Sequence, residues 1–233
     1  MKQKSGLGSA LRRMMGGPPV HVRDRPASGE SVLMNSTRLR IFQALCNHPC
    51  SHVRAISREV GVAPPSVLWH LDKLVERGVA KKARSGNRSI FYPADLLEQD
   101  DVGLLSVLDL ERPDHALRAV LASPGISQGE LARSFGANGH ALGALVRSGA
   151  LETVRDGRHR RYYPAPLLGQ RWEHYELRAR RFKQLVLALL AGEGLSPEAD
   201  RYDRDILEVR VTVGTRVERL RLLCNPFAFS ARK

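Results

Sequence analysis

The clearest pattern of apolar and polar positions lies between Pro64 and Gly78. Val67, Leu71 and Leu74 fall at spacings of four and three residues, which is the inward face of a short helix. The segment opens with two prolines, and a proline in the first turn of a helix has no hydrogen bond to lose. The pattern therefore predicts a helix that begins at Pro64 and ends before Gly78.

An extended pattern follows this helix. Two β-type runs flank a turn at Ser85-Gly86-Asn87, and Pro93 ends the second run, which indicates a hairpin. A short helix followed by a hairpin with a basic tip is typical of a winged helix-turn-helix, in which this helix is the recognition helix. We expect its outward-facing side chains to be Ser66, Leu68, Trp69, His70 and Lys73.

The same sequence pattern occurs a second time along the chain. SVL at residues 31–33 recurs at residues 106–108, a shift of 75 residues. After the helix-turn-helix the shift is 71 residues, because YPADLL at 92–97 matches YPAPLL at 163–168. Such internal similarity predicts two structural units of one kind.

Four residues are missing from the second copy, and they are lost between Gly136 and Leu142. Four residues are about one helical turn, and here it is the leading turn of the second recognition helix. We interpret the second unit as a degenerate copy that does not read bases. Its wing still offers phosphate contacts through Arg155, Arg158 and Arg160.

A heptad seam lies in residues 169–192, and its members are Trp172, Tyr175, Ala179, Phe182, Val186 and Leu189. Such a seam closes either on a second chain or on the chain's own winged domains, and we favour a homodimer. Beyond it, two alternating runs flank a turn at Gly214-Thr215. They predict a hairpin with one buried face.

Together these patterns predict a mainly α protein with small β wings, in the α+β class. In chain order we expect a flexible basic arm (1–30), a first winged helix-turn-helix domain (31–97), a linker (98–105), a second, degenerate winged domain (106–168), a long helix (169–192) and a β-hairpin region (193–233).

Charge narrows the class of partner. The 233 residues carry a formal net charge of +13, and residues 31–97 hold ten Lys and Arg against four Asp and Glu. Clustered cations draw a protein to nucleic acid. The longest apolar run, residues 185–191, is far shorter than the roughly 20 residues of a membrane span. We expect no membrane partner and, without a signal-peptide core, a cytoplasmic protein.

The string V-x-x-H-L-x-x-L at Val67, His70, Leu71 and Leu74 carries a family resemblance. Around it, residues 35–97 resemble the winged helix-turn-helix domain of ArsR-like and MarR-like transcriptional regulators. The tandem arrangement resembles predicted archaeal regulators with two such domains. Ala63 departs from the family pattern, which usually has a capping Ser or Thr there. The resemblance implies a DNA-binding transcription regulator.

Duplex DNA is the partner that this resemblance implies. The major groove would be contacted by Ser66, Trp69, His70 and Lys73, and flanking phosphates or the minor groove by Lys81, Lys82, Arg84, Asn87 and Arg88. Because Leu68 and Trp69 are apolar, we keep an alternative. It is a winged-helix protein-protein interaction module in a transcription or chromosome-associated assembly.

One cluster has the composition of a metal site, namely Cys46, His48, Cys50 and His52, whose thiols and imidazoles suit zinc. The repeat argues against a metal site. At the positions in the second copy that correspond to Cys50 and His52, the chain has Gly125 and Ser127, which are not metal ligands of this kind. No phosphate-binding loop or catalytic motif is present. We therefore expect neither an enzyme nor a cofactor.

Overall fold

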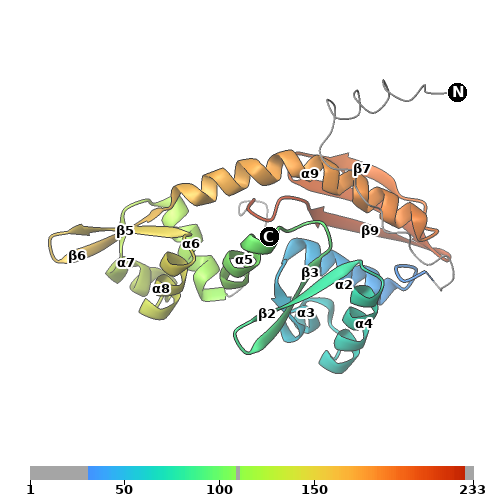
Figure 1. Cartoon of the computed structure of the whole chain (residues 1–233), viewed down its shortest axis with the longest axis horizontal. Helices are drawn as coiled ribbons and strands as arrows, with labels where there is room; N and C mark the ends of the chain where they lie inside the picture. Colours follow the sequence, from blue (N-terminus) through green and yellow to red (C-terminus); the bar gives the residue numbers. More distant parts are fainter. Residues whose placement is uncertain (1–30, 109–110, 229–233) are drawn as a thin grey trace, which may run out of the picture. The chain divides into compact units, whose positions relative to one another are not determined.

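The computed structural model describes residues 31–108 and 111–228, so the predicted arm at residues 1–30 lies outside them. The first run of elements is α2 (Ser36–Asn47), β1 (Ser51–His52), α3 (Val53–Val60), α4 (Pro64–Glu76), β2 (Ala80–Ser85) and β3 (Arg88–Pro93) (Figure 1). Its three strands form an antiparallel sheet in the order β1-β3-β2.

The same order of elements occurs again further along the chain. It consists of α6 (Glu111–Ala122), β4 (Ile126–Ser127), α7 (Gln128–Phe135), α8 (Gly139–Arg147), β5 (Leu151–Asp156) and β6 (His159–Pro164). The strands pair in the equivalent order β4-β6-β5. Helix α8 has 9 residues, whereas α4 has 13. The difference of four residues equals the change in the repeat shift from 75 to 71, which predicts a shorter second helix.

Two short helices connect these runs, η1 (Gln99–Asp101) and α5 (Val102–Leu108). The sequence pattern predicted a linker here, but α5 buries Val102, Leu104, Leu105 and Leu108. Its Ser106 Oγ also lies 3.0 Å from Ser85 Oγ at the end of β2. Since the described chain from Ser31 onward forms one compact unit, a division into separate domains stays a prediction.

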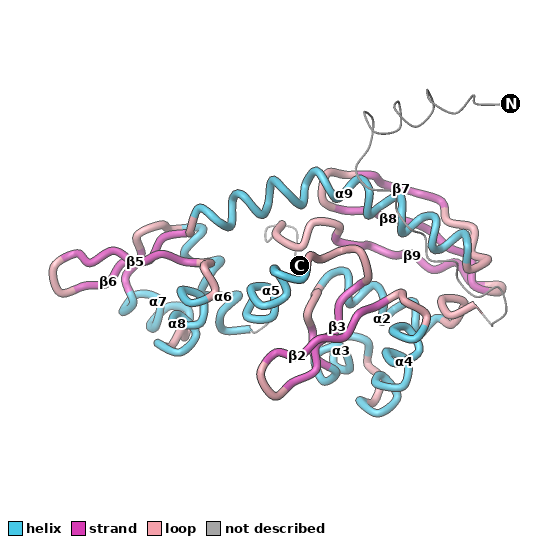
Figure 2. The backbone as a smooth tube through the Cα atoms, viewed as in Figure 1, coloured by secondary structure: helices cyan, strands magenta, loops and turns pink. Residues whose placement is uncertain are grey.

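The C-terminal part consists of one long helix and a sheet. Helix α9 (Pro166–Gly192) is followed by β7 (Glu198–Tyr202), β8 (Ile206–Val213) and β9 (Arg216–Leu223), paired antiparallel in the order β7-β8-β9 (Figure 2). The predicted hairpin is β8 with β9. Strand β7 was missed because its sequence, EADRY, is charged. Its Asp200 pairs with Arg210 of β8 at 2.8 Å.

Helix α9 buries its apolar seam inside the chain. Tyr175, Ala179, Phe182 and Val186 are at most 4% exposed. The Tyr175 ring lies 5.3 Å from that of Phe227, and Lys183 donates a hydrogen bond of 2.9 Å to the carbonyl of Arg204. The seam thus packs largely within the same chain, although Trp172 and Leu189 are only half-buried. The homodimer through Trp172, Tyr175, Phe182, Val186 and Leu189 stays a prediction. Within the described residues no helix is long and apolar enough to cross a membrane.

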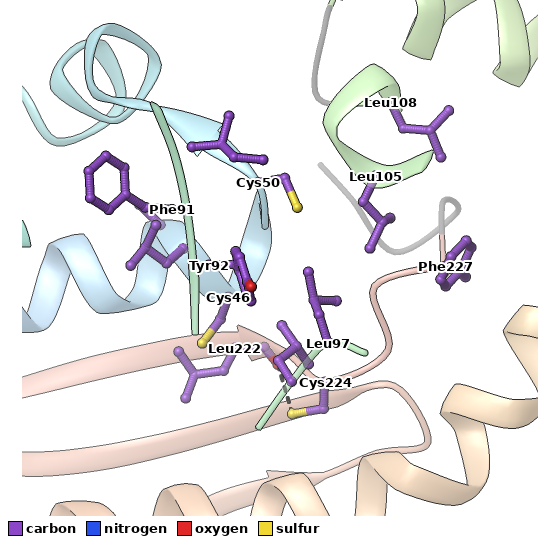
Figure 3. Close-up of a cluster of buried hydrophobic side chains, with 14 of the residues drawn as sticks. Cys46, Cys50, Phe91, Tyr92, Leu97, Leu105, Leu108, Leu222, Cys224 and Phe227 are labelled. Atoms are coloured by element: carbon purple, nitrogen blue, oxygen red, sulfur yellow. Dashed lines mark hydrogen bonds between the residues drawn. The ribbon is translucent and has the colours of Figure 1, made fainter. Parts of the chain in front are cut away.

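The C-terminal sheet also completes the core beneath α2. Cys46 of α2 belongs to a buried cluster that includes Leu222 and Cys224 (Figure 3). Both of these residues come from the C-terminal part of the chain. At its edge the Leu223 amide donates to Asn47 Oδ1 at 3.0 Å. Burial raises the pKa of Cys46 and raises that of Cys224 to about 12, so both thiols stay neutral and behave as small apolar side chains.

Charging the α9 seam should unfold the chain. We expect Phe182→Asp to lower the free energy of unfolding by about 4 kcal/mol or more, because a carboxylate would lose its hydration there. Urea denaturation followed by circular dichroism measures this. Leu177→Asp is the matched control, since Leu177 lies on the same helix and is 81% exposed. A parent dimer that light scattering shows dissociating into a folded Phe182→Asp monomer would contradict the buried seam.

Candidate nucleic-acid interface

Helix α4 is positioned by apolar residues on one face and by prolines at its start. Val67, Leu71 and Leu74 are fully buried. Pro64 and Pro65 occupy the first two helical positions, and the preceding Ala63 makes no side-chain cap. After the helix the chain reverses at Gly78, whose φ of 68° suits glycine. The opposite face of α4 is therefore fixed in place and available to a partner.

That opposite face is apolar at its N-terminal end. Ala63, Pro64, Pro65 and Ser66 are exposed, and so are Leu68 and Trp69, at 38% and 54%. We call these six residues the α4 tip. Of the predicted major-groove residues, the structure places Ser66 and Trp69 on this surface. Lys73 lies beyond them on the same helix and forms an ion pair of 2.8 Å with Glu76.

The prediction that His70 faces outward is wrong. His70 is only 9% exposed, and its ring lies 4.9 Å from the Trp69 ring in an edge-to-face arrangement. Burial lowers the pKa of His70, and the charge of Arg38 on α2 lowers it further. The imidazole is therefore neutral at pH 7 and largely buried beside Trp69, and its Nδ1 has no hydrogen-bond partner among the described residues.

The wing presents its predicted cations to solvent. Lys81, Lys82, Arg84, Asn87 and Arg88 lie on β2, the turn and β3, and none of them is buried. Lys82 lies 3.7 Å from Asp72 of α4 and over the buried Phe91 ring, 5.4 Å from its centroid. These contacts join the base of β2 to α4. Beside the strand, an open pocket of ≈ 370 Å³ separates β2 from η1 and α5.

A second group of cations lies on α3, and the sequence pattern did not single it out. Burial lowers the pKa of His52, and the charges of Arg88, Arg58 and Arg54 lower it further. The three guanidinium groups therefore lie near one another, around His52. Arg54 and Arg58 are four residues apart on α3, and neither is buried. That i, i+4 spacing places them on one helix face and was the available signal. Together with Arg88 at the start of β3, they extend the positive charge of the wing.

The β5-β6 hairpin also carries exposed arginines. Arg155, Arg158 and Arg160 are exposed, and with Ser127 they border an open pocket of ≈ 340 Å³. Arg161 of the same wing is tied to Asp156 at 2.6 Å. The N-terminus of α7 is closed by a capping box, in which the Glu130 carboxylate accepts from the Ser127 amide at 2.9 Å.

The four metal candidates do not form a site. Cys46 and Cys50 are buried at 0% and 1% exposure, whereas His48 and His52 are half-buried. Across residues 31–108 and 111–228, no group of three or more His, Cys, Asp or Glu side chains could hold a metal ion. Cys46 instead lies in the core with Cys224, where burial and then the nearby Cys224 raise its pKa.

Comparison with known proteins agrees with this geometry. Residues 34–81 match the family described as winged helix-turn-helix DNA-binding, and this segment spans α2 through α4 and the start of β2. A 71-residue stretch is 35% identical to an uncharacterized HTH-type transcriptional regulator of Methanocaldococcus jannaschii. It covers 30% of this chain and 18% of that relative's length. Residues 34–81 are therefore similar to a winged helix-turn-helix DNA-binding domain.

Solved structures resemble the chain only weakly. A mutant form of Lactococcus lactis ZitR matches 62% of this chain and 98% of its own, at 18% identity and a TM-score of 0.25. Human N-acetylserotonin methyltransferase matches 70% of this chain and 42% of its own, at 16% identity and a TM-score of 0.26. T. acidophilum IdeR matches 82% of this chain and 93% of its own, at 14% identity and a TM-score of 0.21.

Buried His70 should make the fold sensitive to acid. Its pKa is lowered in the folded chain, so below about pH 6.5 the unfolded chain binds a proton that the folded chain excludes, and stability falls as pH falls. We expect His70→Leu to lose less stability than the parent between about pH 7.5 and about pH 5.5 in urea titrations. His140→Leu, on the exposed surface of α8, is the control. Equal losses in parent and His70→Leu would refute this.

Proposed function

We propose that this protein is a transcription regulator that binds duplex DNA through α4 and the adjoining wing. The observation that carries the proposal is the exposed outer face of α4 beside a wing of exposed Lys and Arg side chains, of which Lys82 lies 3.7 Å from Asp72 of α4. A recognition helix of this kind enters the major groove while flanking cations contact phosphates. The winged helix-turn-helix match over residues 34–81 supports this assignment.

We assign the phosphate contacts of the first unit to Lys81, Lys82, Arg84 and Arg88, with Asn87 at the turn of the wing. Arg54 and Arg58 of α3 join this set because they act with Arg88 on His52. His70 is left out, since it is buried. Lys73 contributes at the edge of the helix, where its side chain is 44% exposed.

We interpret residues 106–168 as a second, degenerate winged domain that assists the first. Its shortened helix α8 carries no lysine, and its only arginine, Arg147, is in the last turn. Its wing nevertheless exposes Arg155, Arg158 and Arg160. Such a unit adds phosphate contacts without base contacts, and therefore affinity without sequence preference.

The alternative function is an interaction module that binds a protein through Leu68 and Trp69. Both side chains are exposed and apolar, as a protein interface requires. The two functions differ in their response to salt. Phosphate-dominated binding weakens log-linearly with salt concentration, whereas an apolar interface responds little. We favour DNA because the adjoining wing and α3 both expose Lys and Arg side chains.

The first test measures the salt dependence of binding to random-sequence duplex. We expect Arg54→Ala with Arg58→Ala to reduce the slope of log affinity against log salt by up to about 1.8, or about 0.9 for each phosphate that is no longer neutralised. Lys81→Ala with Lys82→Ala should have a similar effect. Arg216→Ala is a control of the same charge type on exposed β9. A slope unchanged in the α3 variant would remove that helix from the interface.

The second test separates the two units. We expect Arg158→Ala with Arg160→Ala to weaken binding to all duplexes by a similar factor, because phosphate contacts carry no sequence information. Ser66→Ala, in contrast, should change the sequences recovered from a random pool. Sequencing of the bound fractions measures both effects. The assignment of roles fails if the second-wing variant shifts sequence preference and Ser66→Ala does not.

A further inference from the structure

The α4 tip has few groups that could hydrogen-bond a base. Pro64 and Pro65 carry no amide hydrogen, and the Val67 amide donates to the Ala63 carbonyl at 3.0 Å. Among the six side chains of the tip, only Ser66 and the indole N–H of Trp69 are polar. No Arg, Asn or Gln lies between Ala63 and Lys73, although these residue types make the bidentate contacts with guanine and adenine.

Beyond the buried His70, the next polar side chains along α4 are Asp72 and Lys73, and both have charged partners. Asp72 lies 3.7 Å from Lys82, and Lys73 pairs with Glu76 at 2.8 Å. The largest exposed groups at the leading end of the helix are therefore the Trp69 ring and the Leu68 side chain. The buried His70 ring packs edge-to-face with Trp69, which holds the indole on the outer surface.

The surroundings of the tip indicate the chemistry of its partner. The wing beside α4 exposes Lys81, Lys82, Arg84 and Arg88, and Lys82 lies 3.7 Å from Asp72 of the same helix. A polyanion with apolar groups between its charges is complementary to such a surface. In duplex DNA, the apolar group that base edges present in the major groove is the C5-methyl of thymine.

We propose that the α4 tip reads thymine methyl groups in the major groove, with Trp69 and Leu68 as the specificity-determining side chains. This inference rests on the proposed function, in which α4 is the recognition helix. Apolar contact with a methyl group supplies discrimination without hydrogen bonds, and a buried methyl is worth about fourfold in affinity. The protein therefore selects thymine-containing steps, and Ser66 supplies the hydrogen bond of the same surface.

The experiment compares two duplexes that differ only in methyl groups. The first is recovered from a random-sequence pool by binding to the full chain, and the second is the same duplex with deoxyuridine in place of thymidine. Dissociation constants are measured for both at one salt concentration. We expect the uracil duplex to bind about fourfold more weakly for each methyl contacted. We expect Trp69→Ala to bring the ratio close to one and Leu68→Ala to lower it.

Leu177→Ala is the matched control, because Leu177 is an exposed apolar residue on α9, far along the chain from the tip. It should keep the parent ratio. Any effect of uracil on duplex shape would persist in Trp69→Ala, so the comparison between variants isolates the side-chain contact. Circular dichroism confirms that each variant is folded.

The outcomes separate this inference from the proposed function. Equal, salt-dependent binding of both duplexes by the parent would overturn methyl readout and leave DNA binding in place. In that case an unchanged DNA affinity in Trp69→Ala would assign the tip to a protein partner. A ratio that survives in Trp69→Ala and Leu68→Ala would also overturn the assignment. Failure to bind either duplex would overturn the proposed function itself.

Discussion

The burial of one face of α9 is the constraint on which the rest of the described structure depends. A 27-residue helix with apolar residues every three or four positions is not stable with that face in water, and here Tyr175, Phe182 and Val186 are covered by the same chain. Tyr175 also donates to Asp101 Oδ2 at 2.8 Å and accepts from the Glu98 amide at 2.9 Å. The helix thereby holds both the C-terminal sheet and the segment that connects the two helix-turn-helix runs.

Because of this arrangement, the basic surface around α4 is supported from the far end of the sequence. Leu222 and Cys224 lie under α2, and the Glu193 carboxylate at the end of α9 accepts from Ser31 Oγ at 2.7 Å and from the Leu33 amide at 3.2 Å. The core of the first unit is therefore completed by residues about 160 to 180 positions away. A shorter fragment ending near Leu97 would expose these apolar surfaces of α2.

Much of the fold could be predicted from the sequence because local signals agree with the final packing. Proline at the start of α4 and the spacing of Val67, Leu71 and Leu74 specify the helix, and the shift of 75 then 71 residues locates its shorter counterpart. Other features depend on distant contacts. The helical position of His70 fits either face of α4, and only packing against α2 decides that its side chain is buried. Strand β7 has a charged sequence, and it forms because β8 offers Arg210 as a partner for its Asp200. The packing of the α9 seam within the chain likewise depends on residues of the C-terminal sheet, which the heptad pattern alone does not reveal.

The two prolines at the start of α4 also affect the thermodynamics of binding. Their rings restrict φ in the unfolded chain as well as in the folded chain, so less backbone entropy is lost when this turn is ordered. The leading end of the helix is thus kept in shape by covalent geometry, although Ala63 supplies no cap. Any partner that immobilises this end meets a surface that is already rigid, and the association then carries a smaller conformational penalty.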